Sequence, residues 1–378
     1  MLPAMLTSIA ALLATATRSD PPRTLWRLVS ERDHRALLAA VRAQPPRSED
    51  EDVFLALHEA VSSNDMTSFG ILLGAGASVA FGPNEINLLS TALEGDLAGV
   101  DTVEVIRKLG VSFEDGKQYG TTPLHLAIRS DRVDKCAYVL RSYGAEQLDL
   151  PDGAGYTPLA RAASRGCAPV VDFLLSKGAD VRAGRYPAFV LAARATDASI
   201  LERLLELTPD ITEEERSFAV LQCHVSGGNA TLRALLQAQP RFSLEATNEG
   251  WTILVLAASV GNIERIILLL DAGANIEHYD PKPKDAATPL LAAARFAQTK
   301  AIRVLHAYGA DLHRVDNLGR NALHWAALFP SAECAELLVK LGVDATVRDK
   351  EGKTPADYVE SRPPEERLKL RKALGLEK

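Results

Sequence analysis

Several features that would point to particular chemistries are scarce in this chain of 378 residues. It has four cysteines, and none of them forms a CxxC pair or joins histidines at the spacing of zinc ligands. Isolated cysteines usually serve as small apolar residues in a packed interior. This pattern is typical of a protein in a reducing compartment, such as the cytoplasm, or of one that is insensitive to redox state. The four are Cys136, Cys167, Cys223 and Cys334.

An excess of basic charge is also missing. Lys and Arg total 42 and Asp and Glu total 49, which gives a formal net charge of -7. Such a chain is a poor general binder of nucleic acid or anionic membrane, and we expect neither as a partner. No apolar run is long enough to span a bilayer. Nucleophile elbows, phosphate-binding loops and HExxH metal motifs are absent too, so we expect no catalytic residue, cofactor or metal.

The first 22 residues are unusually apolar. The stretch "MLPAMLTSIAALLATA" has the length of a signal-peptide core, and Ala14-Thr15-Ala16 has the small-x-small form of a cleavage site. No Lys or Arg precedes it, however, and the first basic residue is Arg18. We therefore expect residues 1–22 to be a disordered or loosely docked leader. The alternative is a secreted protein from which Met1 to Ala16 is cleaved.

A repeated motif occupies most of the remaining sequence. "TTPLHLAIRSD" at 121–131 is echoed by "YTPLARAASRG" at 156–166, "WTILVLAASVG" at 251–261, "ATPLLAAARFA" at 287–297 and "RNALHWAALFP" at 320–330. Thr122 and Thr157 lie 35 residues apart, and Thr288 and Asn321 lie 33 apart. A second apolar motif, such as "IERIILLLDAGAN", follows each copy. A fixed period of this kind indicates stacked helical repeats.

The order of the residues in the motif predicts a helix–turn–helix unit. Thr122 is placed to cap the first helix, and Pro123 sits at its first position, where a missing N–H costs nothing. Leu124 faces the core, and His125 can reach both the cap and neighbouring backbone. In another copy, Gly273 is placed to end the second helix. One unit cannot bury its apolar face alone, so the units must stack.

The sequence resembles the ankyrin-repeat family, whose signature includes T-P-L-H-x-A at a period near 33. The resemblance implies an all-α solenoid of about nine to ten helix–turn–helix units, joined by short finger hairpins or turns. His58, His125 and His324 occupy the same slot in three copies, which favours a structural role. We expect degenerate capping helices at 23–50, repeats at 51–353 with two finger-poor units at about 184–248, and a C-terminal cap at 354–378.

The resemblance also implies where a partner would bind. In the family the fingers and first helices line a concave face, and the second helices, which here include Arg265, form the back. Aromatic and Arg side chains, which are enriched in binding hot spots, recur at the predicted concave positions. The candidate partner-binding residues are Tyr156, Arg165, Tyr186, Arg194, Arg216, His224, Trp251, Val260, Arg295, Phe296, Arg320 and Phe329.

One finger, "HYDPKPKDAAT" at 278–288, stands out by its length. Its prolines remove backbone donors, so it cannot continue a regular hairpin. A solvated insertion is one interpretation, and a contact finger is the other. Its candidate contact residues are His278, Tyr279, Lys282 and Lys284.

The function that these patterns favour is a non-enzymatic, monomeric scaffold in the cytoplasm that binds another protein along the concave face. Two alternatives stay open. One is an enzyme or small-molecule binder with a pocket in the concavity, and the other is a secreted effector.

Overall fold

The computed structural model describes residues 24–46, 51–79, 87–111, 120–225, 228–238, 244–248, 250–278, 287–329 and 331–376. The expected leader at 1–22 therefore lies outside the described residues. The chain divides into two compact parts, an N-terminal part (Met1–Ala188) and a C-terminal part (Phe189–Lys378).

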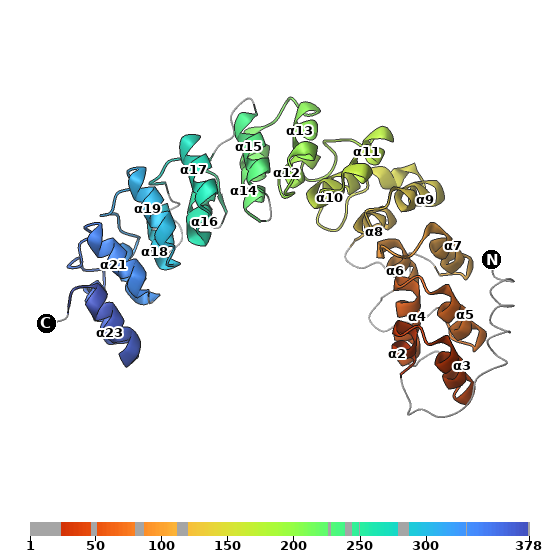
Figure 1. Ribbon diagram of the computed structural model, residues 1–378. Helices are drawn as coiled ribbons and strands as arrows, with labels where there is room; N and C mark the ends of the chain where they lie inside the picture. The colour runs from red at the N-terminus through yellow and green to blue at the C-terminus, as the bar shows by residue number, and fades with distance from the viewer. Residues whose placement is uncertain are drawn as a thin grey trace. The chain divides into compact units, whose positions relative to one another are not determined.

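Helices dominate both parts (Figure 1). The N-terminal part contains α2 (Leu25–Ser30), α3 (His34–Ala43), α4 (Glu51–Ser62), α5 (Met66–Gly74), α6 (Leu88–Glu94), α7 (Val100–Lys108), α8 (Pro123–Arg129), α9 (Val133–Tyr143), η3 (Ala145–Leu148), α10 (Pro158–Arg165) and α11 (Ala168–Ser176). The C-terminal part contains α12 (Ala188–Ala192), α13 (Ser199–Glu206), α14 (Glu213–Val225), α15 (Asn229–Gln237), β1 (Thr247–Asn248), β2 (Trp251–Thr252), α16 (Ile253–Val260), α17 (Ile263–Asp271), α18 (Pro289–Arg295), α19 (Thr299–Ala307), α20 (Ala322–Leu328), α21 (Ala332–Lys340), α22 (Pro355–Glu360) and α23 (Pro364–Ala373). The first residue of α12, Ala188, is the last residue of the N-terminal part.

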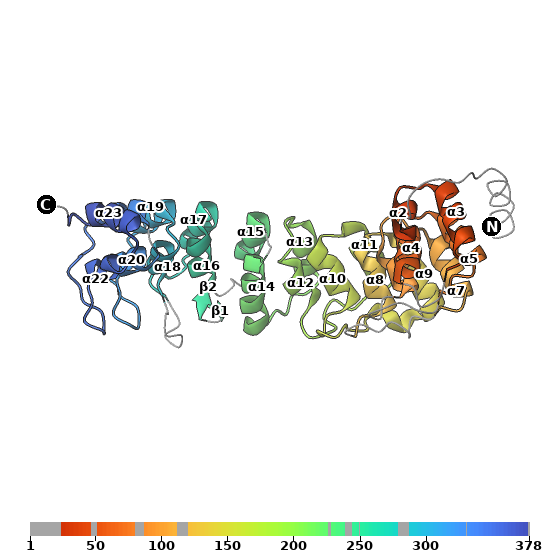
Figure 2. The same cartoon turned by 90° about the horizontal axis from the view of Figure 1, so that it is seen from below.

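The helices form two rows within each part (Figure 2). Even-numbered helices, the first of each pair, pack on even-numbered neighbours: α4 on α6 and α6 on α8, then α14 on α16 and so on to α22. Odd-numbered helices pack in a second row, as α17 does on α19 and α19 on α21. This is the expected all-α repeat solenoid. The nine pairs from α4/α5 to α20/α21 match the expected nine to ten repeats, with one more pair at each end.

Threonine caps start the first helices, as the motif predicts. The hydroxyl oxygens of Thr157, Thr252 and Thr288 each accept a hydrogen bond from the backbone N–H three residues on, at 3.3 to 3.4 Å. Thr122 does the same for His125 at 3.5 Å. These bonds satisfy amides that the first turn leaves without a helical partner. The four threonines are buried, so each cap is shielded from water.

Aspartates build three of the fingers. The Oδ1 atoms of Asp152, Asp316 and Asp349 each accept hydrogen bonds from the backbone N–H groups two and four residues on, at 2.8 to 3.1 Å. A glycine three residues after each aspartate has a positive φ, 79° at Gly319 for example, which L side chains rarely adopt. The D-x-x-G spacing thus fixes a tight turn directly before the capping residue.

One histidine of the motif behaves differently from the others. His58 occupies the expected slot, but α4 begins at Glu51, so His58 lies in the second half of a longer helix. It cannot form the helix-start bond that His125 and His324 form, and its ring instead lies 6.3 Å from that of Phe54. His58 thus contacts a neighbouring side chain of its own helix, whereas His125 and His324 contact the start of a helix.

Candidate protein-binding surfaces

Three consecutive repeats of the C-terminal part expose a large apolar side chain at the same place. Val260 ends α16, and Phe296 and Phe329 follow the last residues of α18 and α20. Their exposed fractions are 60%, 45% and 45%. Burial of these side chains against another surface would be favourable. We call Trp251, Val260, Arg295, Phe296 and Phe329 the apolar strip.

Two aromatic residues of the apolar strip meet across a repeat boundary. Trp251 lies in β2, and its ring centroid is 6.1 Å from that of Phe296 in an edge-to-face arrangement. The structure thus brings together two of the candidate partner-binding residues. Aromatic pairs of this geometry contribute about 0.5–1.5 kcal/mol beyond the area they bury.

Arg295 lies among three rings of the same surface. Its guanidinium carbon is 5.5 Å from the Phe296 centroid, 4.8 Å from that of Trp325 and 5.3 Å from that of Phe329. Each contact falls within the distance at which a cation is attracted to a ring face. The rings therefore hold the arginine in place and lower the entropy that it would lose on binding a partner.

Trp325 is a residue of this surface that sequence reasoning missed. It is only 3% exposed, its ring stacks on Phe329 at 5.8 Å, and the guanidinium of Arg320 lies 4.0 Å from its centroid. Its indole Nε1 is buried without a hydrogen-bond partner. An aromatic residue directly after the histidine of the motif was the available signal. Arg320 itself is bound by Asp316 at 2.8 Å and is 13% exposed.

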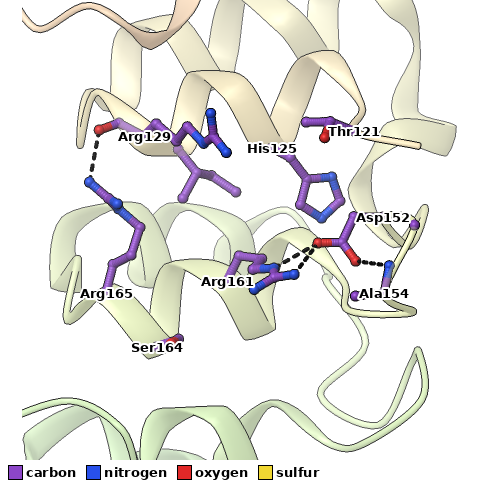
Figure 3. Close-up of a pocket in the computed structure, with 10 residues that line it drawn as sticks. Thr121, His125, Arg129, Asp152, Ala154, Arg161, Ser164 and Arg165 are labelled. Atoms are coloured by element: carbon purple, nitrogen blue, oxygen red, sulfur yellow. Dashed lines mark hydrogen bonds and ion pairs between the residues drawn. The ribbon is translucent and has the colours of Figure 1, made fainter. Parts of the chain in front are cut away.

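The N-terminal part has a hollow of about 650 Å³ between α8, α10 and the finger that joins α9 to α10. Figure 3 shows His125 and Arg129 entering it from α8, and Arg161 and Arg165 from α10. Asp152 reaches it from the finger. We call this site, which Ile128 and Ser164 also line, the arginine hollow.

Ion pairs and hydrogen bonds fix the charged groups of the arginine hollow. Arg161 binds Asp152 Oδ2 through Nε at 2.7 Å and Nη2 at 2.6 Å, and it lies over the Tyr156 ring at 4.6 Å. Burial alone would raise the pKa of Asp152, but backbone amides and Arg161 hold it below its ordinary value. Arg165 Nη2 donates to the carbonyl of Arg129 at 3.0 Å.

The other candidate residues occupy varied places. Tyr186 is half-buried with Arg185 over its ring at 5.5 Å, and Arg194 is half-buried just after α12. His278 pairs with Glu245 at 3.6 Å. His224 lies in α14, where only its backbone is described. The finger residues Tyr279, Lys282 and Lys284 lie outside the described residues.

The repeat pattern did not predict the position of Arg216 or the burial of Arg265. Arg216 was expected directly before a first helix, but it lies in the first turn of α14, because the capping box between Thr212 and Glu215 starts that helix at Glu213. Its side chain is 16% exposed and donates to the carbonyl of Ile211 at 2.7 Å. Arg265, expected on the back, is 6% exposed and donates to the carbonyl of Cys223 at 3.2 Å.

Neither a metal centre nor a membrane span is found in the part of the chain that the structure describes. No three metal-binding side chains gather there. None of the described helices combines the length and apolar character that crossing a bilayer requires.

A family model described as ankyrin repeats matches the chain in three copies, over residues 57–185, 189–280 and 276–349. The ankyrin repeat and KH domain-containing protein mask-1 of Caenorhabditis elegans is 25% identical over 340 residues, which cover 86% of this chain and 13% of that protein. The B-cell lymphoma 3 protein homolog of Mus musculus is 27% identical over 248 residues, which cover 64% of this chain and 49% of that protein. The matches thus span less than half the length of either relative.

Among solved structures, the ankyrin repeat domain of Bcl-3 is similar to this chain at 24% sequence identity and a TM-score of 0.40. The match covers 67% of this chain and 100% of that domain.

Proposed function

We propose that this chain, which belongs to the ankyrin-repeat family, binds a partner protein through the face that carries its fingers and first helices. Ankyrin repeats are generally a non-catalytic module for protein interaction, and this chain carries them over most of its length. We further propose that the residues that contact the partner include the apolar strip in the C-terminal part.

The observation that carries the proposal is the repeated exposure of Val260, Phe296 and Phe329. A large apolar side chain stands at the same position in three successive repeats, at exposed fractions of 45% or more. One exposed apolar residue is ordinary on a protein surface, whereas a row at the repeat spacing offers contiguous area for a partner. Arg295 and Trp251 add residue types that are enriched in binding hot spots.

The rest of the proposal concerns the organisation and setting of the chain. We place caps at 23–50 and 354–378, repeats at 51–353, and the two finger-poor repeats at about 184–248. The four cysteines are unpaired and buried. Burial raises the pKa of Cys136, Cys223 and Cys334 to about 12, so these thiols stay protonated and unreactive. Unpaired buried thiols support a reducing compartment such as the cytoplasm, where we further propose that the chain is a monomer.

A matched pair of valine variants tests the proposed surface. The wild-type chain is used to isolate a stoichiometric partner from its native cell, and the affinity is then measured by titration calorimetry. Val260→Ala removes apolar area from the strip, whereas Val339→Ala removes the same atoms from α21 in the second-helix row, where Val339 is 36% exposed. We expect Val260→Ala to weaken binding and Val339→Ala to leave it unchanged. The reverse pattern would place the partner on the other face.

A further inference from the structure

We propose that the arginine hollow of the N-terminal part binds carboxylate side chains from an acidic segment of the partner protein. This inference rests on the proposed protein-binding function, and it names the chemistry of a second contact site. The carboxylate would be bound by Arg129, Arg161 and Arg165, which lie on two neighbouring first helices.

The charge of the arginine hollow is opposite to that of the chain. Three arginines line it against a single carboxylate, that of Asp152, while the whole chain carries a formal net charge of -7. Glu94 pairs with Arg129 at 2.8 Å, and Asp152 pairs with Arg161. Arg165 has its bond to a backbone carbonyl, and no carboxylate of the described residues forms an ion pair with it. The chain as a whole repels anions because of its net negative charge. An anion would therefore be attracted where positive charges gather, as in the arginine hollow.

The arginines keep donors free for a ligand. A guanidinium carries five N–H groups in a fixed fork. Arg161 directs both of its bonds to Asp152 at one oxygen, Oδ2, and Arg165 uses one amino group on the Arg129 carbonyl. The unused donors of two such forks match the two oxygens of a carboxylate, which arginine binds through paired hydrogen bonds.

The arginine hollow is also held in shape before any ligand arrives. Asp152 is fixed by the backbone amides of Ala154 and Tyr156 at 2.9 and 3.1 Å, and it fixes Arg161 in turn. Arg161 is further held over the Tyr156 ring. Because these side chains are already ordered, a bound carboxylate loses less free energy to their immobilisation.

The lining residues favour a carboxylate over an apolar side chain. Ile128 is the large aliphatic residue of the lining, and it is only 1% exposed. A ligand would therefore meet mainly polar and charged side chains, those of Thr121, His125, Arg129, Asp152, Arg161, Ser164 and Arg165. The volume of about 650 Å³ is within the range of about 300–1,000 Å³ typical of ligand sites. The apolar strip and the arginine hollow thus differ in chemistry.

The test uses the full chain and a fluorescein-labelled octaglutamate peptide, with fluorescence anisotropy read at low and at physiological salt. We expect Arg165→Gln and Arg129→Gln each to weaken binding by about fivefold or more, since each removes a positive charge next to the ligand. Arg165→Lys should retain part of the affinity, because it keeps the charge without the fork. Arg141→Gln is the matched control, because it removes the same charge from α9 outside the arginine hollow. It should bind within about twofold of the wild type.

Several outcomes overturn the proposal. One is that octaglutamate fails to bind, and another is that Arg141→Gln weakens binding as much as Arg165→Gln does. Displacement of the peptide by inorganic phosphate at much lower concentration than by acetate would assign a phosphate in place of a carboxylate. Thermal melting of each variant checks that it is folded. If the peptide result fails while Val260→Ala still weakens partner binding, only the acidic recognition is wrong and the proposed function stands.

Discussion

His125 joins two adjacent repeats through the backbone of Tyr156. Its Nε2 lies 3.0 Å from the Tyr156 carbonyl oxygen, and its Nδ1 lies 2.8 Å from the Thr122 hydroxyl. The carbonyl can only accept, so Nε2 carries the proton and Nδ1 accepts from Thr122 when the ring is neutral. His324 repeats the arrangement with the carbonyl of Lys353 at 3.1 Å. In both cases the acceptor directly precedes the residue that caps the next first helix.

The first prediction follows from this bond. His125→Leu should lower the free energy of unfolding by about 1–3 kcal/mol, because it removes a hydrogen-bond partner from the part-buried Tyr156 carbonyl and from the buried Thr122 hydroxyl. Urea denaturation monitored by circular dichroism measures the change. His313→Leu, at an exposed histidine, is the control and should have little effect. An unchanged midpoint for His125→Leu would show that the bond between repeats does not contribute to stability.

The second prediction concerns pH. Burial lowers the pKa of His125 below its ordinary value of 6.5, although the nearby Asp152 charge and the Tyr156 carbonyl oppose this. The unfolded chain then binds the proton more readily than the folded chain, so stability falls as the pH falls below about 6.5. We expect the advantage of the wild type over His125→Leu to be smaller at pH 5.5 than at pH 7.5. An advantage that grew on acidification would mean that the folded ring prefers the charged form.

The third prediction concerns the threonine cap of α10. Thr157→Ala should cost about 0.5–2 kcal/mol, because the Ala160 N–H loses its acceptor at the start of the helix. Thr196→Ala, at an exposed threonine after α12, is the control. Differential scanning calorimetry of both variants measures the loss. Equal melting temperatures for the two variants would contradict the capping role.

The fourth prediction concerns a buried lysine. Lys135 is fully buried in α9, and its Nζ donates to the carbonyls of Ala92 and Leu93 at the end of α6, at 2.6 and 3.3 Å, and also to that of Gly95. Burial lowers the pKa of Lys135 to about 8, so the ammonium is still the main form at neutral pH.

We expect Lys135→Met to destabilise the chain by about 1–3 kcal/mol at pH 7, because the carbonyls at the end of α6 lose their donor. Lys177→Met, at an exposed lysine, serves as the control. Chemical denaturation would reveal a gain in stability instead if the desolvation of the charge outweighed its hydrogen bonds.

The fifth prediction concerns Trp251. Trp251→Ala should weaken partner affinity by about 2 kcal/mol, the scale of a hot-spot residue. Trp26→Ala removes an equally large ring from α2 in the N-terminal part, where Trp26 is 44% exposed, and should leave affinity unchanged. Titration calorimetry compares the two. Equal effects of both variants would show that general destabilisation, rather than lost contact, causes the change.

The sequence by itself determined the local structure of this protein. The Thr-Pro pairs determined where α8, α10, α18 and α22 begin, because caps and helix starts depend on neighbours within four residues. Gly273 ends its helix as expected, at C′ with a φ of 93°. The sequence also placed Trp251 and Phe296 on the same predicted face of successive repeats, and their rings lie 6.1 Å apart.

Only the tertiary structure decided which polar groups are buried. Lys135 and Arg265 occupy the third position of α9 and α17, and each donates to a carbonyl more than 40 residues earlier in the sequence. Periodicity cannot predict this, because burial of a cation depends on whether a helix end of the preceding repeat lies within its reach. The same holds for the burial of Trp325 and for the arginine hollow, whose walls are assembled from the side chains of two repeats and one finger.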